Sequence, residues 1–215
     1  MGPLQPARVL TNRPVRVGTW LMRLESTGPH VPGQCIGVCL DPATPPRSYS
    51  LCSPSRDTAH EILYDVVDGG ALTPALARLG PGDVVLCTRP FGAFRDHPGP
   101  SVWVATGTGV APFVSMARTD PCADKTLVQG SGAPDGLHFR SLFQTAGLRS
   151  YVPCCSRRPD PTVYAGRVTA YLAACDLDPV AHYLLCGSAQ MIVDARDLLI
   201  ARGVPYRRIL AEVYF

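Results

Sequence analysis

Residues 101–118 read SVWVATGTGVAPFVSMAR, and this stretch decides the fold of the second half of the chain. It begins with a short apolar run typical of a buried strand, passes through a glycine turn, and continues as a helical pattern that Pro112 can start. Glycines let the backbone approach a ligand closely, and a helix start offers unpaired N–H groups that favour phosphate. An ordinary αβ connection can use the same turn. The spacing is not G-x-G-x-x-G, which disfavours an ordinary Rossmann dehydrogenase.

Downstream of residue 98, apolar runs alternate with helical patterns. Strands are expected at 101–106, 126–130, 150–155, 182–187 and 208–215, and helices at 111–118, 138–147, 166–174 and 189–203. Strands that alternate with helices predict a parallel, doubly wound sheet. Ligands on such sheets bind beyond the carboxyl ends of the strands, where the glycine turn lies.

Upstream of residue 98, short strand patterns are separated by turn signals. They cover 6–15, 18–25, 34–40, 48–52, 61–67 and 83–90. One helix fits residues 73–79, with Thr73 as its cap, Pro74 at its first position and Gly80 at its end. The sequence therefore predicts a two-domain β + α/β protein. An antiparallel β-barrel spans residues 1–97, and a parallel-sheet α/β domain spans residues 98–215.

Bulk composition excludes several classes of protein. The chain has 215 residues, of which 46% are apolar and 17% charged, so it can form a packed core. A net charge of +3 is too small to argue for nucleic acid binding. No apolar run reaches the roughly 18 residues that span a bilayer, and the N-terminus lacks an apolar signal core. The nine cysteines include no C-x-x-C pair, so we expect a cytoplasmic protein with reduced thiols and no metal.

The stretch 47–54, RSYSLCSP, combines a cation, an aromatic ring and hydroxyls in a few residues. Strand alternation places Arg47 and Tyr49 on one face and Ser48 and Ser50 on the other. A run of this kind, taken alone, is most often an ordinary edge strand.

Six motifs in order change that interpretation. They are RSYS at 47–50, DGGALT at 68–73, PFGAF at 90–94, ATGTGVAP at 105–112, LCGSAQM at 185–191 and AEVYF at 211–215. Their order and spacing resemble the ferredoxin/flavodoxin–NADP reductase family, and most closely its bacterial stand-alone branch, over nearly the whole chain. The resemblance implies an FAD-binding barrel, an NADP-binding α/β domain, and FAD and NADP(H) as cofactors. It also implies an enzyme that moves electrons between NADPH and a one-electron carrier, ferredoxin or flavodoxin.

The resemblance also assigns roles around the flavin. Arg47 contacts the FAD pyrophosphate, Tyr49 stacks on the isoalloxazine, and Ser50 lies near flavin N5. Cys186 lies beside the nicotinamide, and Glu212 is linked to proton movement. The catalytic candidates are Ser50, Cys186, Glu212 and Tyr214. The complete set expected to bind FAD is Arg47, Ser48, Tyr49, Ser50, Ala71, Leu72, Thr73, Thr108, Tyr214 and Phe215.

A second set is expected to bind NADP. It comprises Gly107, Thr108, Gly109, Ser156, Arg157, Arg167, Cys186 and Gly187. By resemblance, Ser156, Arg157 and Arg167 hold the 2′-phosphate; a solvated basic surface is the alternative. The chain departs from the family at Ser131–Gly132, where an arginine that reaches NADP usually stands, and at Arg158, where many relatives carry Glu. The missing arginine weakens the expected preference for NADP over NAD, and Arg158 is a candidate to compensate for it.

The expected partner is an acidic carrier that binds transiently through charge, and the family suggests a monomer. Arg13, Arg16, Arg23 and Arg95 could supply the positive rim. One alternative is the reductase component of an oxygenase, or a free-flavin reductase, on the same fold. Fused oxygenase reductases carry a plant-type C-x4-C-x2-C cluster motif that is missing here. Another is a non-catalytic electron-transfer subunit, in which a cysteine-rich carboxyl end would replace EVYF.

Overall fold

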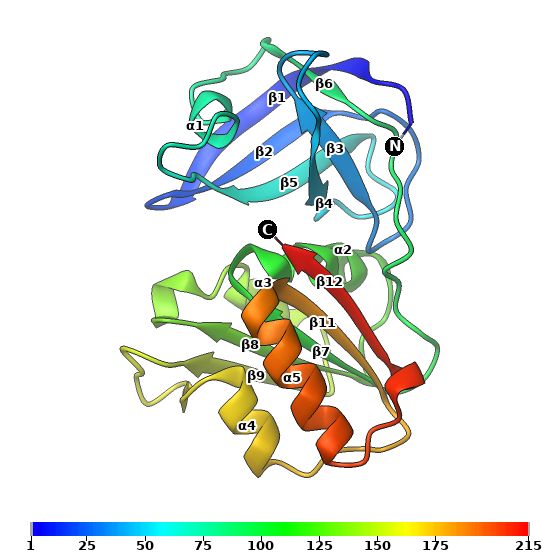
Figure 1. Ribbon diagram of the computed structural model, residues 1–215, viewed down its shortest axis with the longest axis vertical. Coiled ribbons are helices and arrows are strands. Elements are labelled where there is room, and N and C mark those ends of the chain that lie inside the picture. Colours follow the sequence, from blue (N-terminus) through cyan, green and yellow to red (C-terminus); the bar gives the residue numbers. More distant parts are fainter. Residues whose placement is uncertain (1, 215) are drawn as a thin grey trace. The chain divides into compact units, whose positions relative to one another are not determined.

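The fold is known from a computed structural model that describes residues 2–214, with the side chain of Tyr214 outside the description (Figure 1). The chain forms two compact units. The first comprises Met1–Arg95 and Ala111–Thr119, and the second comprises Asp96–Val110 and Asp120–Phe215. The sequence placed the helix at 111–118 in the second domain, whereas this helix, α2 (Ala111–Thr119), groups with the first unit.

The first unit is an antiparallel barrel. Its strands are β1 (Gln5–Arg16), β2 (Thr19–Glu25), β3 (Cys35–Cys39), β4 (Arg47–Ser50), β5 (Ala59–Asp65) and β6 (Val84–Cys87). They pair in the order β4-β3-β6-β1-β2-β5. A bridge between Leu51 and Ile62 joins the two edges of this order, and alternate apolar side chains, Met22 and Ile36 among them, fill the interior.

Helix α1 (Thr73–Leu76) is shorter than the sequence predicted, and the predicted Thr73 cap is wrong. Leu72 is the N-cap residue and makes no side-chain cap hydrogen bond. The Thr73 hydroxyl instead accepts a hydrogen bond from Val67 N at 2.9 Å, so it closes the preceding loop.

Asn12 of β1 holds the other end of α1. Its Nδ2 donates to the carbonyl oxygens of Leu76 and Leu79 at 2.8 and 2.9 Å. Its Oδ1 accepts from the Tyr64 hydroxyl at 3.1 Å. The Asn12 amide thus donates to carbonyls at the carboxyl end of α1, which ends at Leu76 and does not reach Gly80.

The second unit is built on a parallel sheet. Its strands are β7 (Ser101–Thr106), β8 (Lys125–Ser131), β9 (Ser150–Cys155), β10 (Tyr164–Ala165), β11 (His182–Ser188) and β12 (Ile209–Tyr214). Their order is β10-β9-β8-β7-β11-β12, so the winding reverses between β7 and β11. The two-residue strand β10 was not expected from the sequence.

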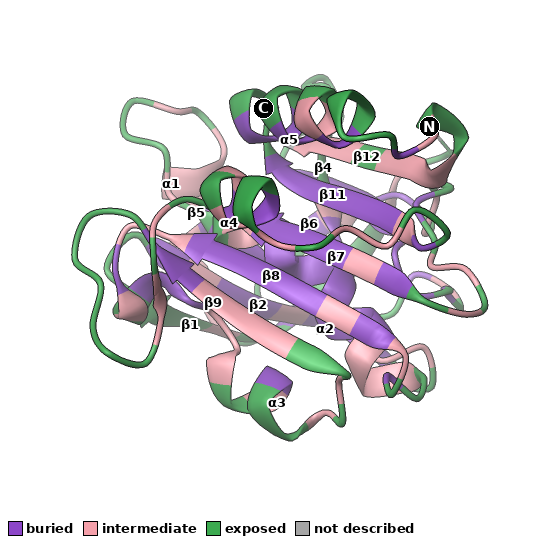
Figure 2. Ribbon diagram, turned by 90° about the horizontal axis from the view of Figure 1, so that it is seen from below, coloured by how far each residue is buried: buried purple, intermediate pink, exposed green. Residues whose placement is uncertain are grey.

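Helices α3 (Arg140–Thr145), α4 (Val168–Ala174) and α5 (Ala189–Ala201) connect these strands. Three short 3-10 turns, Gly107–Val110, Pro134–Gly136 and Tyr206–Arg208, complete the unit. Figure 2 shows β7, β8 and β11 as almost continuously buried strands, which is why they read as apolar runs. Val104, Val128 and Leu185 pack one face of the sheet against α4 and α5.

Further features of the described residues concern membrane spans, metal sites and disulfides. No helix among them is long and apolar enough to cross a membrane. Among the same residues, no group of three His, Cys, Asp or Glu side chains could hold a metal ion. All nine cysteines are thiols, and eight of them are buried.

Candidate cofactor-binding sites

Strand β4 presents the predicted flavin residues in order of increasing burial. Arg47 and Ser48 are exposed, Tyr49 is partly buried, and Ser50 is 2% exposed. Among the described residues, the Arg47 guanidinium forms no hydrogen bond or ion pair, so its donors remain available. Strand β4 therefore presents an exposed cation beside a partly buried aromatic ring.

The Tyr49 ring packs against the ring of Tyr64. The two ring centroids lie 6.3 Å apart with an interplanar angle of 73°, an edge-to-face contact. Burial raises the pKa of Tyr49 to about 12, although the neighbouring Arg47 lowers it in part. The phenol is therefore neutral at physiological pH, and the ring offers an uncharged flat surface.

The predicted pyrophosphate segment, Ala71–Thr73, precedes and begins α1. Ala71 is exposed, and Leu72 packs against the barrel core while remaining partly buried. The bond from Val67 N to the Thr73 hydroxyl fixes the end of this segment, and the Asn12 bonds to the Leu76 and Leu79 carbonyls fix the helix that follows it. Asn12, which the sequence pattern did not single out, thus helps to position α1 behind this segment.

The glycine turn lies at the point where the parallel sheet reverses its winding, between β7 and β11. A Cβ atom at Gly109 would lie 2.5 Å from the Cys186 carbonyl oxygen, so no larger residue fits. Gly187 has φ +149° and a Cβ there would lie 2.3 Å from Thr106 Oγ1. The Thr106 hydroxyl oxygen is buried and has no hydrogen-bond partner among the described residues. A reversal point of this kind is where α/β sheets bind ligands.

Cys186 and Glu212 are brought together, because they are register partners in the parallel pair β11–β12. Cys186 has no exposed surface, and Glu212 is partly exposed. Gly107 is exposed and Thr108 half-buried on the turn beside them. Tyr214 ends β12 opposite Ser188. The Tyr214 side chain and Phe215, both predicted to contact FAD, lie outside the described residues.

The predicted 2′-phosphate residues gather at the carboxyl ends of β8, β9 and β10. The turn that carries Ser156 and Arg157 is fixed by backbone bonds from Ser156 N to Ser131 O at 3.1 Å and from Arg157 N to Gly132 O at 3.0 Å. Ser156 and Arg157 are exposed. Among the described residues, the Arg157 guanidinium has no hydrogen bond or ion pair.

Arg167 joins the same corner of the sheet. Gly166 N donates to the Cys155 carbonyl at 2.9 Å, which brings Arg167, the exposed N-cap residue of α4, beside the end of β9. Arg158 is exposed and lies 3.9 Å from an Asp135 carboxylate oxygen, a weak surface pair. The structure therefore brings the three predicted residues Ser156, Arg157 and Arg167 to one edge.

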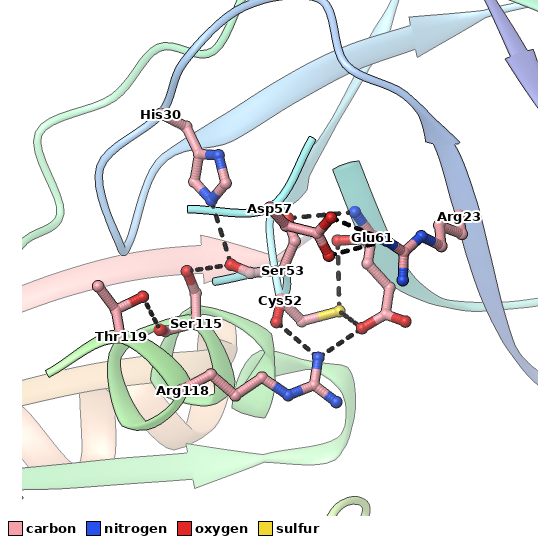
Figure 3. Close-up of polar contacts among 9 residues, drawn as sticks. All are labelled: Arg23, His30, Cys52, Ser53, Asp57, Glu61, Ser115, Arg118 and Thr119. Atoms are coloured by element: carbon pink, nitrogen blue, oxygen red, sulfur yellow. Dashed lines mark hydrogen bonds and ion pairs between the residues drawn. The ribbon is translucent and has the colours of Figure 1, made fainter. Parts of the chain in front are cut away.

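A polar cluster in the first unit was not found from the sequence (Figure 3). Arg118, in the last turn of α2, donates from Nη1 to the Cys52 carbonyl at 2.9 Å and to Glu61 Oε2 at 2.5 Å. The Ser115 hydroxyl donates to the Ser53 carbonyl at 2.6 Å. These bonds fasten α2 to the segment that follows β4 and to β5. A basic residue in a last helical turn was the only sequence signal.

The cluster extends to neighbouring charges of the barrel. The Arg23 Nη2 donates to both carboxylate oxygens of Asp57 at 2.8 and 3.0 Å. Arg23 is thus engaged within the barrel. The other members of the predicted positive rim, Arg13, Arg16 and Arg95, are exposed. Burial is the main cause that raises the pKa of the Cys52 thiol well above its usual value, so this cysteine is an inert buried group.

Comparison with known proteins agrees with this geometry. The sequence model of the oxidoreductase NAD-binding domain matches residues 103–197. Ferredoxin–NADP reductase A of Sorangium cellulosum (strain So ce56) is 32% identical over 190 residues, which cover 73% of this chain and 67% of that protein. The flavodoxin/ferredoxin–NADP reductase of Rhodobacter capsulatus is 35% identical, covering 79% and 74%. The chain belongs to the ferredoxin–NADP reductase family.

Solved structures of the family share the fold. The crystal structure of an Amycolatopsis cytochrome P450 reductase matches with a TM-score of 0.87 and 28% identity, covering 99% of this chain and 71% of that one. The predicted family and the predicted β-barrel plus parallel α/β fold are confirmed. FAD and NADP(H), the predicted cofactors, are confirmed as those of the family. The individual site residues stay predictions.

Proposed function

We propose that this chain is an FAD-dependent oxidoreductase that takes a hydride from NADPH and passes electrons singly to ferredoxin or flavodoxin. The observation that carries the proposal is the carboxyl edge of the parallel sheet. There the backbone of Gly109 in the glycine turn packs directly against the backbone of Gly187. At the same edge, the Arg157 guanidinium has no hydrogen-bond partner among the described residues. A close-approach turn and an unpaired guanidinium fit a dinucleotide with an additional phosphate.

The barrel residues fit a flavin dinucleotide. An exposed guanidinium at Arg47 suits a pyrophosphate, because charge-assisted bonds to phosphate oxygens are strong. The Tyr49 ring, neutral and supported by Tyr64, suits stacking on a flat heterocycle. The segment Ala71–Thr73 would contribute backbone N–H groups to the same pyrophosphate. FMN has no pyrophosphate, so these contacts favour FAD.

When bound, FAD supplies the redox chemistry, and the protein binds, orients and tunes it. On this proposal Ser50 would donate a hydrogen bond to the flavin, and Glu212 would be the carboxylate that takes part in proton transfer. Cys186 and Thr108 would contact the nicotinamide. Tyr214 and Phe215, whose side chains lie outside the described residues, would supply the aromatic rings for the flavin and the adenine.

A second candidate function is that of a reductase that supplies an oxygenase. Its support is the similarity to reductase components such as that of propane 2-monooxygenase in Rhodococcus jostii, 28% identical, of which the chain covers 55%. In this function a separate iron–sulfur protein would carry the electrons onward. The barrel and the nicotinamide site would work in the same way, so the two functions differ only in the acceptor.

Stopped-flow reduction tests the common part of both functions. The flavin band of the purified protein should bleach anaerobically with NADPH, and less readily with NADH. A colourless protein that takes up no FAD, or a flavin that NADPH does not reduce, would refute the proposal. Turnover with a panel of a ferredoxin, a flavodoxin and free FMN then separates the acceptors. Fast reduction of free FMN alone would favour a flavin reductase instead.

A further inference from the structure

At the carboxyl edge of the sheet, the Arg157 guanidinium fills the place that a side chain at position 132 would take. A Cβ atom built on Gly132 would lie 2.4 Å from Arg157 Nη2, 2.6 Å from Nε and 2.9 Å from Cζ. All three atoms belong to the guanidinium. The planar head of Arg157 therefore lies directly over the bare backbone of Gly132, where any side chain would displace it.

The backbone holds this arrangement in register. Arg157 N and Arg158 N both donate to the Gly132 carbonyl at 3.0 Å, and Ser156 N donates to the Ser131 carbonyl at 3.1 Å. The turn after β9 is thus fixed on the last residues beyond β8. Because the stem of Arg157 starts from a fixed point, the empty position at 132 decides where the guanidinium comes to rest.

The guanidinium has nothing else to hold it. Among the described residues it makes no hydrogen bond and no ion pair, unlike the Arg118 guanidinium, which donates to the Cys52 carbonyl and to the Glu61 carboxylate. An exposed arginine normally samples many rotamers, and ordering it on binding an anion has an entropic cost. Packing on a flat glycine surface restricts that sampling while leaving the donors open.

We propose that Gly132 is a positioning residue for recognition of the 2′-phosphate, and that it acts by providing the surface on which Arg157 rests. This inference depends on the proposed preference for NADPH. It makes Ser131–Gly132 part of the specificity of the chain: the missing side chain at 132 is what allows the guanidinium of 157 to occupy that place.

Gly132→Ala is a clean perturbation. The backbone of Gly132 is outside the left-handed region, so alanine adopts it without strain. The atoms in the way are the far end of a flexible side chain, which can swing out without disturbing the core. The thermal midpoint should therefore stay the same or rise slightly, because alanine reduces the freedom of the unfolded chain.

Binding of nucleotide fragments tests the proposal without catalysis. Adenosine 2′,5′-bisphosphate carries the distinguishing phosphate, and adenosine 5′-monophosphate lacks it. By calorimetry on the flavin-loaded protein, Arg157→Ala should weaken the bisphosphate roughly ten- to a hundredfold. Gly132→Ala should weaken bisphosphate binding by about fivefold or more, which is part of the loss expected for Arg157→Ala. Binding of the monophosphate should be unchanged in both variants. In steady state, the KM for NADPH should rise while kcat and the KM for NADH stay constant.

The double variant shows whether Gly132 acts through Arg157. Gly132→Ala added to Arg157→Ala should have no further effect, since the guanidinium it displaces is gone. Gly80→Ala is the matched control: Gly80 also lies outside the left-handed region, and a Cβ there meets nothing within 4 Å. It should leave both nucleotides unaffected.

Two failures are distinguishable. A wild-type protein that binds both nucleotides equally would overturn the NADPH preference, and this inference with it. A wild-type preference that survives intact in Gly132→Ala, or additive losses in the double variant, would overturn this inference alone.

Discussion

The contacts of Arg118 that hold α2 against the barrel strands lead to a quantitative prediction. Replacing Arg118 with Met removes the donor to the Cys52 carbonyl at 2.9 Å and the partner of Glu61 at 2.5 Å. The side chains of Arg118 and Glu61 are 28% and 16% exposed. Breaking a fully buried pair costs about 3–5 kcal/mol, whereas an exposed pair contributes about 0–1 kcal/mol. The partial exposure here places the expected loss of unfolding free energy at about 2 kcal/mol.

A single fluorophore makes the assay specific to the first unit. The chain has two tryptophans, Trp20 in β2 of the first unit and Trp103 in β7 of the second. With Trp103→Phe as the common background, urea unfolding followed by Trp20 fluorescence reports the barrel with its helix α2. Arg118→Met, Glu61→Gln and their combination complete a double-mutant cycle, in which we expect a coupling energy of at least about 1 kcal/mol.

The matched control is another arginine–glutamate pair of the barrel. Arg8 Nε lies 3.5 Å from Glu25, and the two side chains are 59% and 52% exposed. Arg8→Met should therefore change the unfolding free energy by less than about 0.5 kcal/mol. If Arg118→Met and Arg8→Met prove equally mild, the reasoning from burial is wrong, and α2 is held by its apolar contacts alone.

Three further predictions concern the flavin, the gate and pH. Arg47→Ala should weaken FAD binding by one to two decades, since a charge-assisted bond contributes about 1.5–3 kcal/mol; titration of apoprotein checks this, with Arg13→Ala as the exposed control, and recovery of FMN alone from the native protein would contradict it. Tyr214→Ser should tighten NADP⁺ binding and produce a charge-transfer band, because no ring then has to move; unchanged affinity would point to Phe215. Burial, and then the neighbouring His30, lower the pKa of His60 to about 4. The unfolding free energy of the barrel should therefore fall by up to about 3 kcal/mol between pH 6.5 and pH 4, because the unfolded state takes up the proton first. A His60→Gln variant with the same loss of stability in acid would refute this.

Much of the fold was readable because buried parallel strands are short apolar runs bounded by turns. The strands at 101–106 and 150–155 have the predicted bounds, and α2 starts at the expected Ala111. Strand β10 could not be predicted, since two residues carry no periodicity. Helix α1 ends early because Asn12 takes the carbonyls of Leu76 and Leu79, a contact between segments far apart in sequence.

The grouping of α2 with the first unit was hidden for the same reason. Chain order placed this helix after β7 and hence in the second domain, but Ser115 and Arg118 bind carbonyls of the segment after β4. A pattern of apolar residues shows that a helix has a buried side, not which partner covers it. The proposed role of Gly132 could not be predicted from the sequence either, because it depends on the position of the Arg157 guanidinium beside the bare backbone.

The hydrogen-bond and ion-pair partners of a basic side chain, more than its position in the sequence, show whether it has a structural role or is available to a ligand. Lys125, the one lysine, is buried and donates to the carbonyls of His97 and Gly99 at 2.9 and 2.6 Å. Arg118 is likewise engaged with fixed acceptors, whereas Arg47 and Arg157 have no hydrogen-bond or ion-pair partner among the described residues. We therefore expect Arg47 and Arg157 to recognise the anion at the two proposed sites, because a phosphate can form two bonds at once with a guanidinium.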